Sequence, residues 1–477
     1  MKKRISIIRL LIIFCLLGIV FSVIALTVAR PLTAKVYHYL CNTYTEFVTA
    51  AEVEKLYQYE PESAEEIDVT DLRLPEVPPL SEEEEELWTK TVALVLKEDL
   101  WTERDMYDAA HYLMVPMHYA FYTKDSSKIS AFHDFFARFI EDVSDKDSYG
   151  FCVERPTVNH LQFCYFVSEY LRLCAIFGFA AETLPDLYEF VYQHTVNMFE
   201  SGKDGWTNLG SFRARIEQIL LHTQFPRSFD SALTDVELYL LATLCDLRVV
   251  AKLQKFEDTA ILQDATMLAY KIFTDASIIT ETEKGGFLFQ VGVMKDYPDY
   301  EYAGNLEITP DIQPKPREDI VSDSSHSARF ALWLTSFQQA QDYQEQYDVF
   351  QLRREQLANQ LVNYVIVYEK GVPLATTFMD GTCGVYRYSY NSEGVGHQGY
   401  SLSGTLLLGW WSFLDDPRIT QVYRDILAQF PMSAGMDNPY FDYATTREQN
   451  PFFDMDTAFD NGMMECMVAL ASKFGTT

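Results

Sequence analysis

The residues best suited to chemistry are a carboxylate, an imidazole and a guanidinium at helical spacing. Asp323, His326 and Arg329 follow one another at intervals of three residues, and an apolar run begins directly after them. Residues three apart in a helix lie on the same side of it. Such groups are costly to bury without partners, so their position at the start of a buried helix indicates either a functional cluster or a cap formed by Asp323.

A second cluster repeats this spacing near the start of an earlier helix. Asp108 and His111 are again three residues apart, and Arg104 lies four residues before Asp108. A pattern this short also arises by chance, so the repeat alone has low specificity. We expect Asp108, Asp323 and His326 to be catalytic, with the two carboxylates acting as a pair.

The third group of candidate residues lies in a loop rich in glycine and aromatic residues, between Asp380 and Tyr400. Aromatic faces stack on sugar rings, and fixed donors and acceptors bind sugar hydroxyls. We therefore expect a carbohydrate ligand. The side chains that we expect to bind it are Arg104, His111, Arg329, Asp380, Tyr388, His397 and Tyr400.

The hydrophobic pattern predicts twelve helices between residues 81 and 473. Short connections alternate with long ones, which is typical of antiparallel helical hairpins. The predicted helices span residues 81–98, 103–122, 127–143, 159–177, 185–200, 234–254, 257–275, 323–342, 347–369, 400–414, 417–430 and 457–473.

Six such hairpins predict an all-α domain over residues 81–477, arranged as an (α/α)6 toroid. The helices entered from long loops would form the inner ring, because stretches such as 400–414 are apolar nearly all round. Helix 81–98 would pack beside helix 457–473 and close the circle. An irregular bundle or an open α-solenoid is the alternative.

This arrangement resembles the six-hairpin glycosidase superfamily and the related (α/α)6 polysaccharide lyases and epimerases. The resemblance covers residues 81–473 and lies in architecture and loop asymmetry. No family-specific motif accompanies it, so no catalytic residue is inherited from a relative. The resemblance implies activity on carbohydrates at the face where the inner helices begin, although fold analogy alone is a weak warrant for function.

The leading hypothesis is therefore a glycoside hydrolase or polysaccharide lyase acting on an envelope or extracellular glycan. Hydrolysis requires two carboxyl groups that flank the scissile bond. Lysis of a uronic acid polymer would instead use His or Tyr as base and Arg to face the substrate carboxylate. The alternative is a non-catalytic protein, either a glycan-binding or an envelope-assembly scaffold.

Residues 5–29 predict a transmembrane anchor. Leu10 to Ala29 is a charge-free run of twenty residues, which is long enough to span the hydrocarbon core. Four basic residues precede this run, so the N-terminus should be cytoplasmic and the domain extracytoplasmic. We expect residues 1–30 to be a cytoplasmic tip and anchor, and 31–80 a stalk with an acidic, proline-containing linker.

Composition narrows the range of partners. The net charge of −31 argues against nucleic acid, whose binding requires clustered Lys and Arg. The eight cysteines are scattered, without the Cys/His spacing of a zinc site. We expect a membrane contact through the N-terminal helix, a carbohydrate ligand, and neither a metal nor a cofactor.

The length of the apolar run distinguishes an anchor from a signal peptide, whose apolar region is typically about 7–15 residues. We expect the mature protein to keep its first residues and to fractionate with membranes. N-terminal sequencing checks this, and a mature chain that begins after Ala25 or Ala29 would show cleavage instead.

Overall fold

The structure is a computed structural model, which describes most of the chain after residue 49, namely residues 50–63, 65–144, 158–202, 210–388, 396–435, 437–441, 453 and 455–475. This part is mostly helical, which confirms the predicted all-α class. The predicted anchor lies outside the described residues. Among those residues, no helix combines the length and apolarity needed to cross a membrane.

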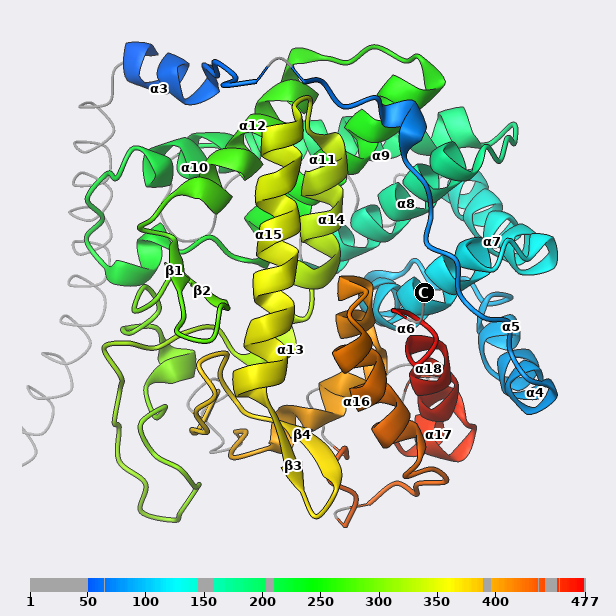
Figure 1. Cartoon of the computed structure of the whole chain (residues 1–477), viewed down its shortest axis with the longest axis vertical. Coiled ribbons are helices and arrows are strands. Elements are labelled where there is room, and N and C mark those ends of the chain that lie inside the picture. The colour runs from blue at the N-terminus through cyan, green and yellow to red at the C-terminus, as the bar shows by residue number, and fades with distance from the viewer. Residues whose placement is uncertain are drawn as a thin grey trace, which may run out of the picture.

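An inner set of elements surrounds the centre of the described part (Figure 1). It comprises α6 (Glu103–Tyr122), α8 (Val158–Phe177), α11 (Asp235–Gln254), α14 (Phe330–Ala340), the 3-10 pair η6 (Ser401–Leu408) and η7 (Trp410–Leu414), and α18 (Met463–Ala471). Each element packs against the next in this order, and α18 packs against α6. The contacts of the inner elements therefore return to their starting point.

An outer set of helices packs on the inner elements. It comprises α4 (Glu82–Lys90), α7 (Ser126–Ser144), α9 (Leu184–Ser201), α12 (Ala260–Thr274), α15 (Gln344–Gln360) and α16 (Pro417–Leu427). Helices α7, α9, α12 and α15 contact α6, α8, α11 and α14 respectively, while α16 contacts η7 and α18. Helix α4 contacts α18, and Lys473 forms an ion pair with Glu84 at 2.8 Å. The predicted contact between the two ends of the domain is confirmed.

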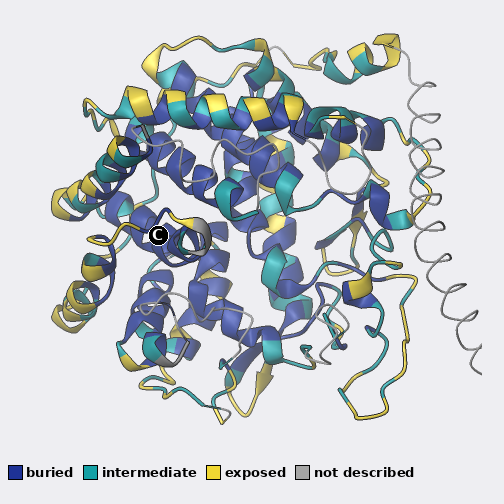
Figure 2. Ribbon diagram, turned by 180° about the vertical axis from the view of Figure 1, so that it is seen from behind, coloured by how far each residue is buried: buried dark blue, intermediate teal, exposed yellow. Residues whose placement is uncertain are grey.

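The inner and outer helices differ in how far their residues are buried. Every residue of α8 from Leu161 to Cys174 is buried, as is every residue of α11 from Glu237 to Ala251. The outer helices carry exposed residues along one side (Figure 2). A helix buried on all faces needs neighbours on all faces, which the closed circle of contacts supplies.

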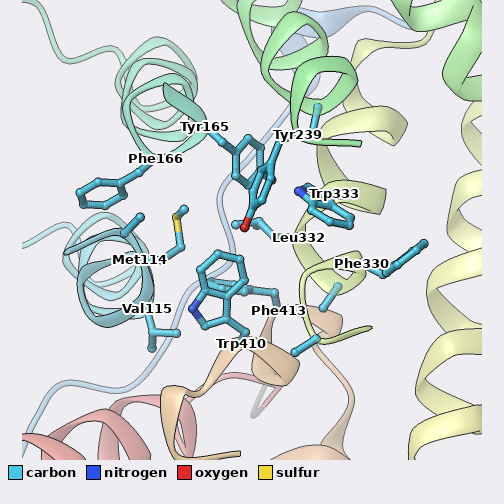
Figure 3. Packing of buried hydrophobic residues seen from close by; sticks show 14 of the residues in the cluster. Met114, Val115, Tyr165, Phe166, Tyr239, Phe330, Leu332, Trp333, Trp410 and Phe413 are labelled. Carbon is cyan, nitrogen blue, oxygen red and sulfur yellow. The ribbon is translucent and has the colours of Figure 1, made fainter. Parts of the chain in front are cut away.

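Large apolar side chains from the inner elements meet at the centre (Figure 3). Met114 comes from α6, Tyr165 from α8, Trp333 from α14 and Trp410 from η7, and all four are buried. Trp333 packs edge-on against Tyr239 of α11, with ring centroids 4.9 Å apart. Each such side chain contributes roughly 1.5–3 kcal/mol by burial, so this core holds the circle together.

A buried polar network crosses the same core. Glu169 of α8 lies 3.0 Å from His118 Nε2 of α6, accepts a hydrogen bond from Ser336 of α14 at 2.9 Å, and pairs with Arg172. Arg172 Nε lies 3.0 Å from Asp246 of α11. These groups tie four inner helices together.

The surroundings shift the pKa values of the two carboxyl groups in this network in opposite directions. Burial acts to raise the pKa of Glu169, but the charge of Arg172 and the contact with His118 outweigh it and lower that pKa to about 2. The pKa of Asp246 is raised well above its ordinary value by burial and by the negative charge of Glu169. Burial lowers the pKa of His118. The Glu169–Arg172 ion pair is therefore the part of the network that the surroundings favour most strongly.

Shorter elements precede α4 or lie between the longer helices. They are α3 (Ala50–Tyr57), η2 (Val69–Asp71), α5 (Val92–Val95), α10 (Phe212–Leu220), η3 (Ser228–Ser231), η4 (Pro298–Tyr300), α13 (Ser324–Ser327), the π-turn η5 (Leu361–Val365), α17 (Met455–Asp460), and the antiparallel strand pairs β1 (Ile279–Glu281) with β2 (Phe287–Phe289) and β3 (Ile366–Glu369) with β4 (Val372–Ala375). The sequence pattern did not predict α10 or the strand pairs.

Three predicted helices, 81–98, 323–342 and 457–473, are each divided into two in the structure, and two others contain segments that are not α-helical. Residues 366–369 form β3 rather than the end of a helix, because Lys370 and Gly371 both adopt positive φ and close a two-residue hairpin turn. Residues 400–414 form two 3-10 segments interrupted at Gly409, whose φ of 79° is left-handed and ends the first segment. The stretch is buried as predicted, although it is not α-helical.

The linker before α4 lies on the domain surface (Figure 1). Ile67 N–H donates to Asp342 at 2.8 Å, between α14 and α15, and the Tyr119 hydroxyl near the end of α6 donates to Pro78 at 3.0 Å. Ser81 followed by Glu82 to Glu86 is the sequence pattern of a capped helix start, and in the structure Ser81 caps α4 in a capping box with Glu84. The linker thus contacts the ends of α6 and α14 remote from their starts.

Replacing Arg172 with Met tests the buried ion pair. The change leaves the Glu169 charge buried without its main partner, so we expect the free energy of unfolding to decrease by about 3–5 kcal/mol. Arg424→Met, at an exposed residue of α16, is the control and should change the free energy of unfolding by less than about 1 kcal/mol. Urea unfolding measures both, and equal effects of the two changes would contradict this account.

Candidate functional site

A polar recess lies where several inner elements begin. Its lining comes from the first turns of α6, from α13 and the residue just before α14, from η6, and from the segment around Tyr386. Its described lining consists of Tyr107, His111, Ser325, His326, Arg329, Tyr386, Arg387, His397, Leu402, Thr405 and Leu408. The cavity measures about 40 Å³, which is more than the roughly 10–15 Å³ that one water requires.

Asp323 and His326 form a tightly coupled pair at this recess. The Asp323 carboxylate accepts the backbone N–H of Ser325 at 3.1 Å and of His326 at 3.0 Å, so it caps α13. The same carboxylate lies 2.9 Å from His326 Nδ1. Asp323 is buried, whereas 25% of the His326 side chain is exposed. With Nδ1 held by Asp323, Nε2 is the imidazole nitrogen that remains for a ligand.

The environment keeps Asp323 ionised. Burial acts to raise the pKa of this carboxyl, but the charge and hydrogen bond of His326 and the Ser325 hydroxyl outweigh it and hold the pKa well below its ordinary value. A carboxylate with this many donors is a poor proton donor. We therefore interpret Asp323 as the residue that orients His326.

Arg329 forms the floor of the recess. It pairs with Asp235, and its Nη2 donates to the Tyr107 hydroxyl at 2.8 Å. The ring of Tyr107 packs edge-on against His111, with centroids 4.3 Å apart. Only 5% of the Arg329 side chain is exposed, and its Nε has no acceptor among the described residues.

Arg387 forms the more accessible wall. Its Nε donates to Asp299 at 2.9 Å, and its backbone N–H donates to the Asp299 carbonyl at 2.8 Å. Its φ of 60° lies in the left-handed region, which is uncommon for a residue other than glycine. Such a conformation persists only where the surroundings fix it, and Asp299 supplies that fixation. Burial raises the pKa of Asp299, and Arg387 opposes this.

Tyr386 places a phenol in the same recess. Its backbone pairs with His397 through two hydrogen bonds of 2.8 Å, and its ring centroid lies 6.5 Å from that of His326. Burial raises the pKa of Tyr386 well above its ordinary value, so the hydroxyl keeps its proton at neutral pH. The recess therefore holds a proton donor and an imidazole together.

The structure brings together some of the predicted site residues. His111, His326, Arg329 and His397 line the recess, with Asp323 directly behind His326. Asp108 is buried on α6 and is not among the described lining residues. The Arg104 side chain lies outside the description.

Three predicted residues lie outside the described lining. Asp380 pairs with Arg317 at 2.7 Å and accepts the Thr382 N–H at 3.0 Å, which stabilises its own turn. Tyr388 packs against Tyr302 with ring centroids 4.8 Å apart. The Tyr400 carbonyl accepts the Ser403 hydroxyl at 2.6 Å.

Sequence reasoning did not assign Tyr107, Tyr386, Arg387 and Asp299 to the site. The first three lie within clusters that the sequence had marked, at positions 104–111 and 380–400. Asp299 comes from η4, in the long loop before α13, and carries no sequence signal. Its role follows only from its contact with Arg387.

A larger cavity of about 410 Å³ lies between β4 and the end of α16. Among its described lining residues, only Asp437 and Tyr440 carry ionisable side chains. The Tyr440 hydroxyl donates a hydrogen bond to the Pro373 carbonyl at 2.7 Å. Among the described residues no cluster of His, Cys, Asp or Glu suits a metal. The recess at His326 therefore concentrates more acid–base groups and is the candidate site.

Comparison with protein-family models, curated proteins and solved structures gives no match to this chain. The site must therefore be interpreted from its own geometry.

Replacing Asp323 with Asn tests what its negative charge contributes apart from its role as a helix cap. Asparagine caps about as well as aspartate, but it removes the charge that faces His326. We expect the free energy of unfolding at pH 7 to decrease by about 1–3 kcal/mol, and Asp68→Asn, a change at the cap of η2, to have little effect.

The same change alters the pH dependence of stability. Because the folded-state pKa of Asp323 is lowered, its contribution is complete above the ordinary carboxyl pKa of about 3.9 and is lost as the pH falls further. Urea unfolding at pH 7 and in acid should therefore show a smaller difference between parent and variant in acid. A difference that does not shrink would contradict this assignment.

Proposed function

We propose that this protein is a carbohydrate-active enzyme, anchored in the membrane with its domain outside the cytoplasm, and that its ligand binds at the His326 recess. The observation that carries the proposal is the Asp323–His326 pair, a buried carboxylate 2.9 Å from a partly exposed imidazole. This arrangement fixes one imidazole nitrogen and leaves the other for proton transfer.

The proposed fold is an (α/α)6 toroid of the six-hairpin type. The closed series of contacts among the inner elements and the outer helices packed on them support it. The recess lies where α6, α14 and η6 begin, which is the face that carries the ligand in this architecture. The fold supports a carbohydrate ligand by analogy, and the chemistry must come from the site.

The groups at the recess favour transfer of a proton to or from carbon over hydrolysis by two carboxyl groups. Hydrolysis requires carboxyl groups on both sides of the scissile bond. No described lining residue carries one, since Asp323 lies behind His326 and Asp299 behind Arg387. Imidazole and phenol are the available groups, so His326 is the proposed base and Tyr386 the proposed acid.

A polysaccharide-degradation screen on the full chain tests the proposal. We expect at least one glycan to be cleaved, and His326→Asn to lower turnover by about 10²-fold or more, because the amide can still bond to Asp323 but cannot transfer a proton. His222→Asn, at a side chain that is 62% exposed, is the matched control and should leave turnover unchanged.

The outcomes separate the enzyme from its alternative. Glycan binding without cleavage would favour a non-catalytic scaffold. Equal turnover of parent and His326→Asn, with the fold preserved by circular dichroism, would remove His326 from the mechanism. Neither binding nor cleavage across neutral and acidic glycans would overturn the carbohydrate assignment.

A further inference from the structure

We propose that the larger cavity, between β4 and the end of α16, is a second glycan-binding site that takes a sugar unit without an acidic group. It holds one part of a polysaccharide while another part of the same polymer occupies the His326 recess. The inference rests on the proposed function for the class of ligand, and it goes beyond that function by assigning a site away from the acid–base groups. It follows from the size, the walls, the charge and the position of the cavity.

The cavity has the size and the lining of a ligand site. Its volume is about 410 Å³, compared with about 40 Å³ for the recess, and falls within the roughly 300–1,000 Å³ of typical small-molecule sites. Such sites combine apolar surface with a few hydrogen-bonding side chains. Val372, Met432 and Pro439 supply apolar surface here, while Gln429 and Ser433 supply an amide and a hydroxyl. This lining suits a ring that has both apolar faces and hydroxyl groups.

Hydrogen bonds within the walls fix the shape of the cavity. The Asn438 side chain donates to the Ser433 carbonyl at 3.0 Å and accepts the Tyr440 N–H at 3.0 Å. The Tyr440 side chain is fully buried, and its hydroxyl donates to the Pro373 carbonyl of β4 at 2.7 Å. The segment around Asn438 is thus held to the strand pair. A preformed site of this kind loses less free energy on binding than one that has to be ordered.

The charge of the cavity disfavours an acidic ligand. None of its described lining residues is basic, and Asp437 carries the one formal charge among them. The Asp437 side chain is exposed and forms no ion pair or hydrogen bond with another described residue. A carboxylate accepts hydrogen bonds from hydroxyl groups and stronger ones from a protonated amine. The ligand that fits is therefore a neutral or amine-bearing sugar unit.

The cavity lies on the same face of the domain as the recess. Helix α16 ends beside β4 (Figure 1), and both α16 and η6 contact that strand. At the end of β4, the Ala375 N–H donates to Ser403 Oγ of η6 at 2.9 Å, and the neighbouring Leu402 lines the recess. A strand rises about 3.3 Å per residue, so Val372 at the cavity lies about 10 Å from Ala375. A polysaccharide of several units is long enough to reach both sites.

Two sites for one polymer raise its affinity by linkage. Once one part of the polymer is bound, binding of the second part is intramolecular, and the overall affinity exceeds that of either site alone. A disaccharide is too short to occupy both sites and cannot gain in this way. The consequence of the second site is therefore retention of long glycans.

Polymer length tests the inference. The probes are neutral polysaccharides of glucose, mannose or N-acetylglucosamine units, and chitosan as an amine-bearing one, each compared with its own disaccharide. Binding is measured on the full chain carrying His326→Asn, so that the proposed base is absent and the probes stay intact. We expect at least one polymer to bind about 10-fold or more tightly, per disaccharide unit, than its disaccharide does.

Variants in the same background identify the cavity. Ala434→Trp fills it with a large side chain and should reduce the advantage of the polymer to about 2-fold or less. Asp437→Ala removes the exposed carboxylate and should also reduce the advantage, most of all for chitosan. The matched control is Ala181→Trp, at a partly buried loop residue after α8 that is not among the described lining residues, and it should keep the full advantage.

The outcomes separate the second site from the proposed function. Equal binding of polymer and disaccharide would overturn the second site while the proposed function stands. Equal effects of Ala434→Trp and Ala181→Trp, with the fold preserved by circular dichroism, would do the same. If Ala434→Trp does not fold, Asp437→Ala decides, and an unchanged ratio would overturn the assignment to this cavity. Binding of acidic polymers alone would overturn the ligand class, and failure of every glycan would overturn the proposed function as well.

Discussion

The inner elements bury side chains on every face, so each requires neighbours all around it, and the contact of α18 with α6 supplies the last of them. Without that contact, apolar surface of both helices would be exposed to water, and each Å² of it would cost roughly 25 cal/mol of folding free energy. The recess likewise draws its lining from α6, α13 and η6, which are distant in sequence. It therefore exists only when these elements are packed together.

The polar network around Glu169 and Arg172 shows how the centre tolerates charge. A buried pair of this kind gains little net stability, because desolvation offsets the attraction between its members. Breaking it is costly, and the bonds that it makes are directional. We interpret the network as a constraint on which helices meet, since His118, Glu169 and Asp246 come from α6, α8 and α11.

The recess also contains buried charged groups that are stabilised by partners of opposite charge. His326, Arg329 and Arg387 each pair with a carboxylate that is not among the described lining residues, so each is oriented and its burial is compensated. Opposite charges at a few ångströms act strongly, whereas the overall acidity of the chain is screened over roughly 8–10 Å in physiological salt. A recess lined by basic side chains can therefore exist on a strongly acidic protein.

The sequence by itself determined the all-α class, the approximate helix ranges and the Ser81 cap, because these depend on local periodicity and capping chemistry. It also placed Asp323, His326 and Arg329 on one side of a helix start. Only the tertiary structure decided that Arg329 pairs with Asp235 and that Asp299 fixes Arg387 across 88 residues of chain. Such contacts depend on packing between distant segments, and side-chain spacing along one element carries no information about it.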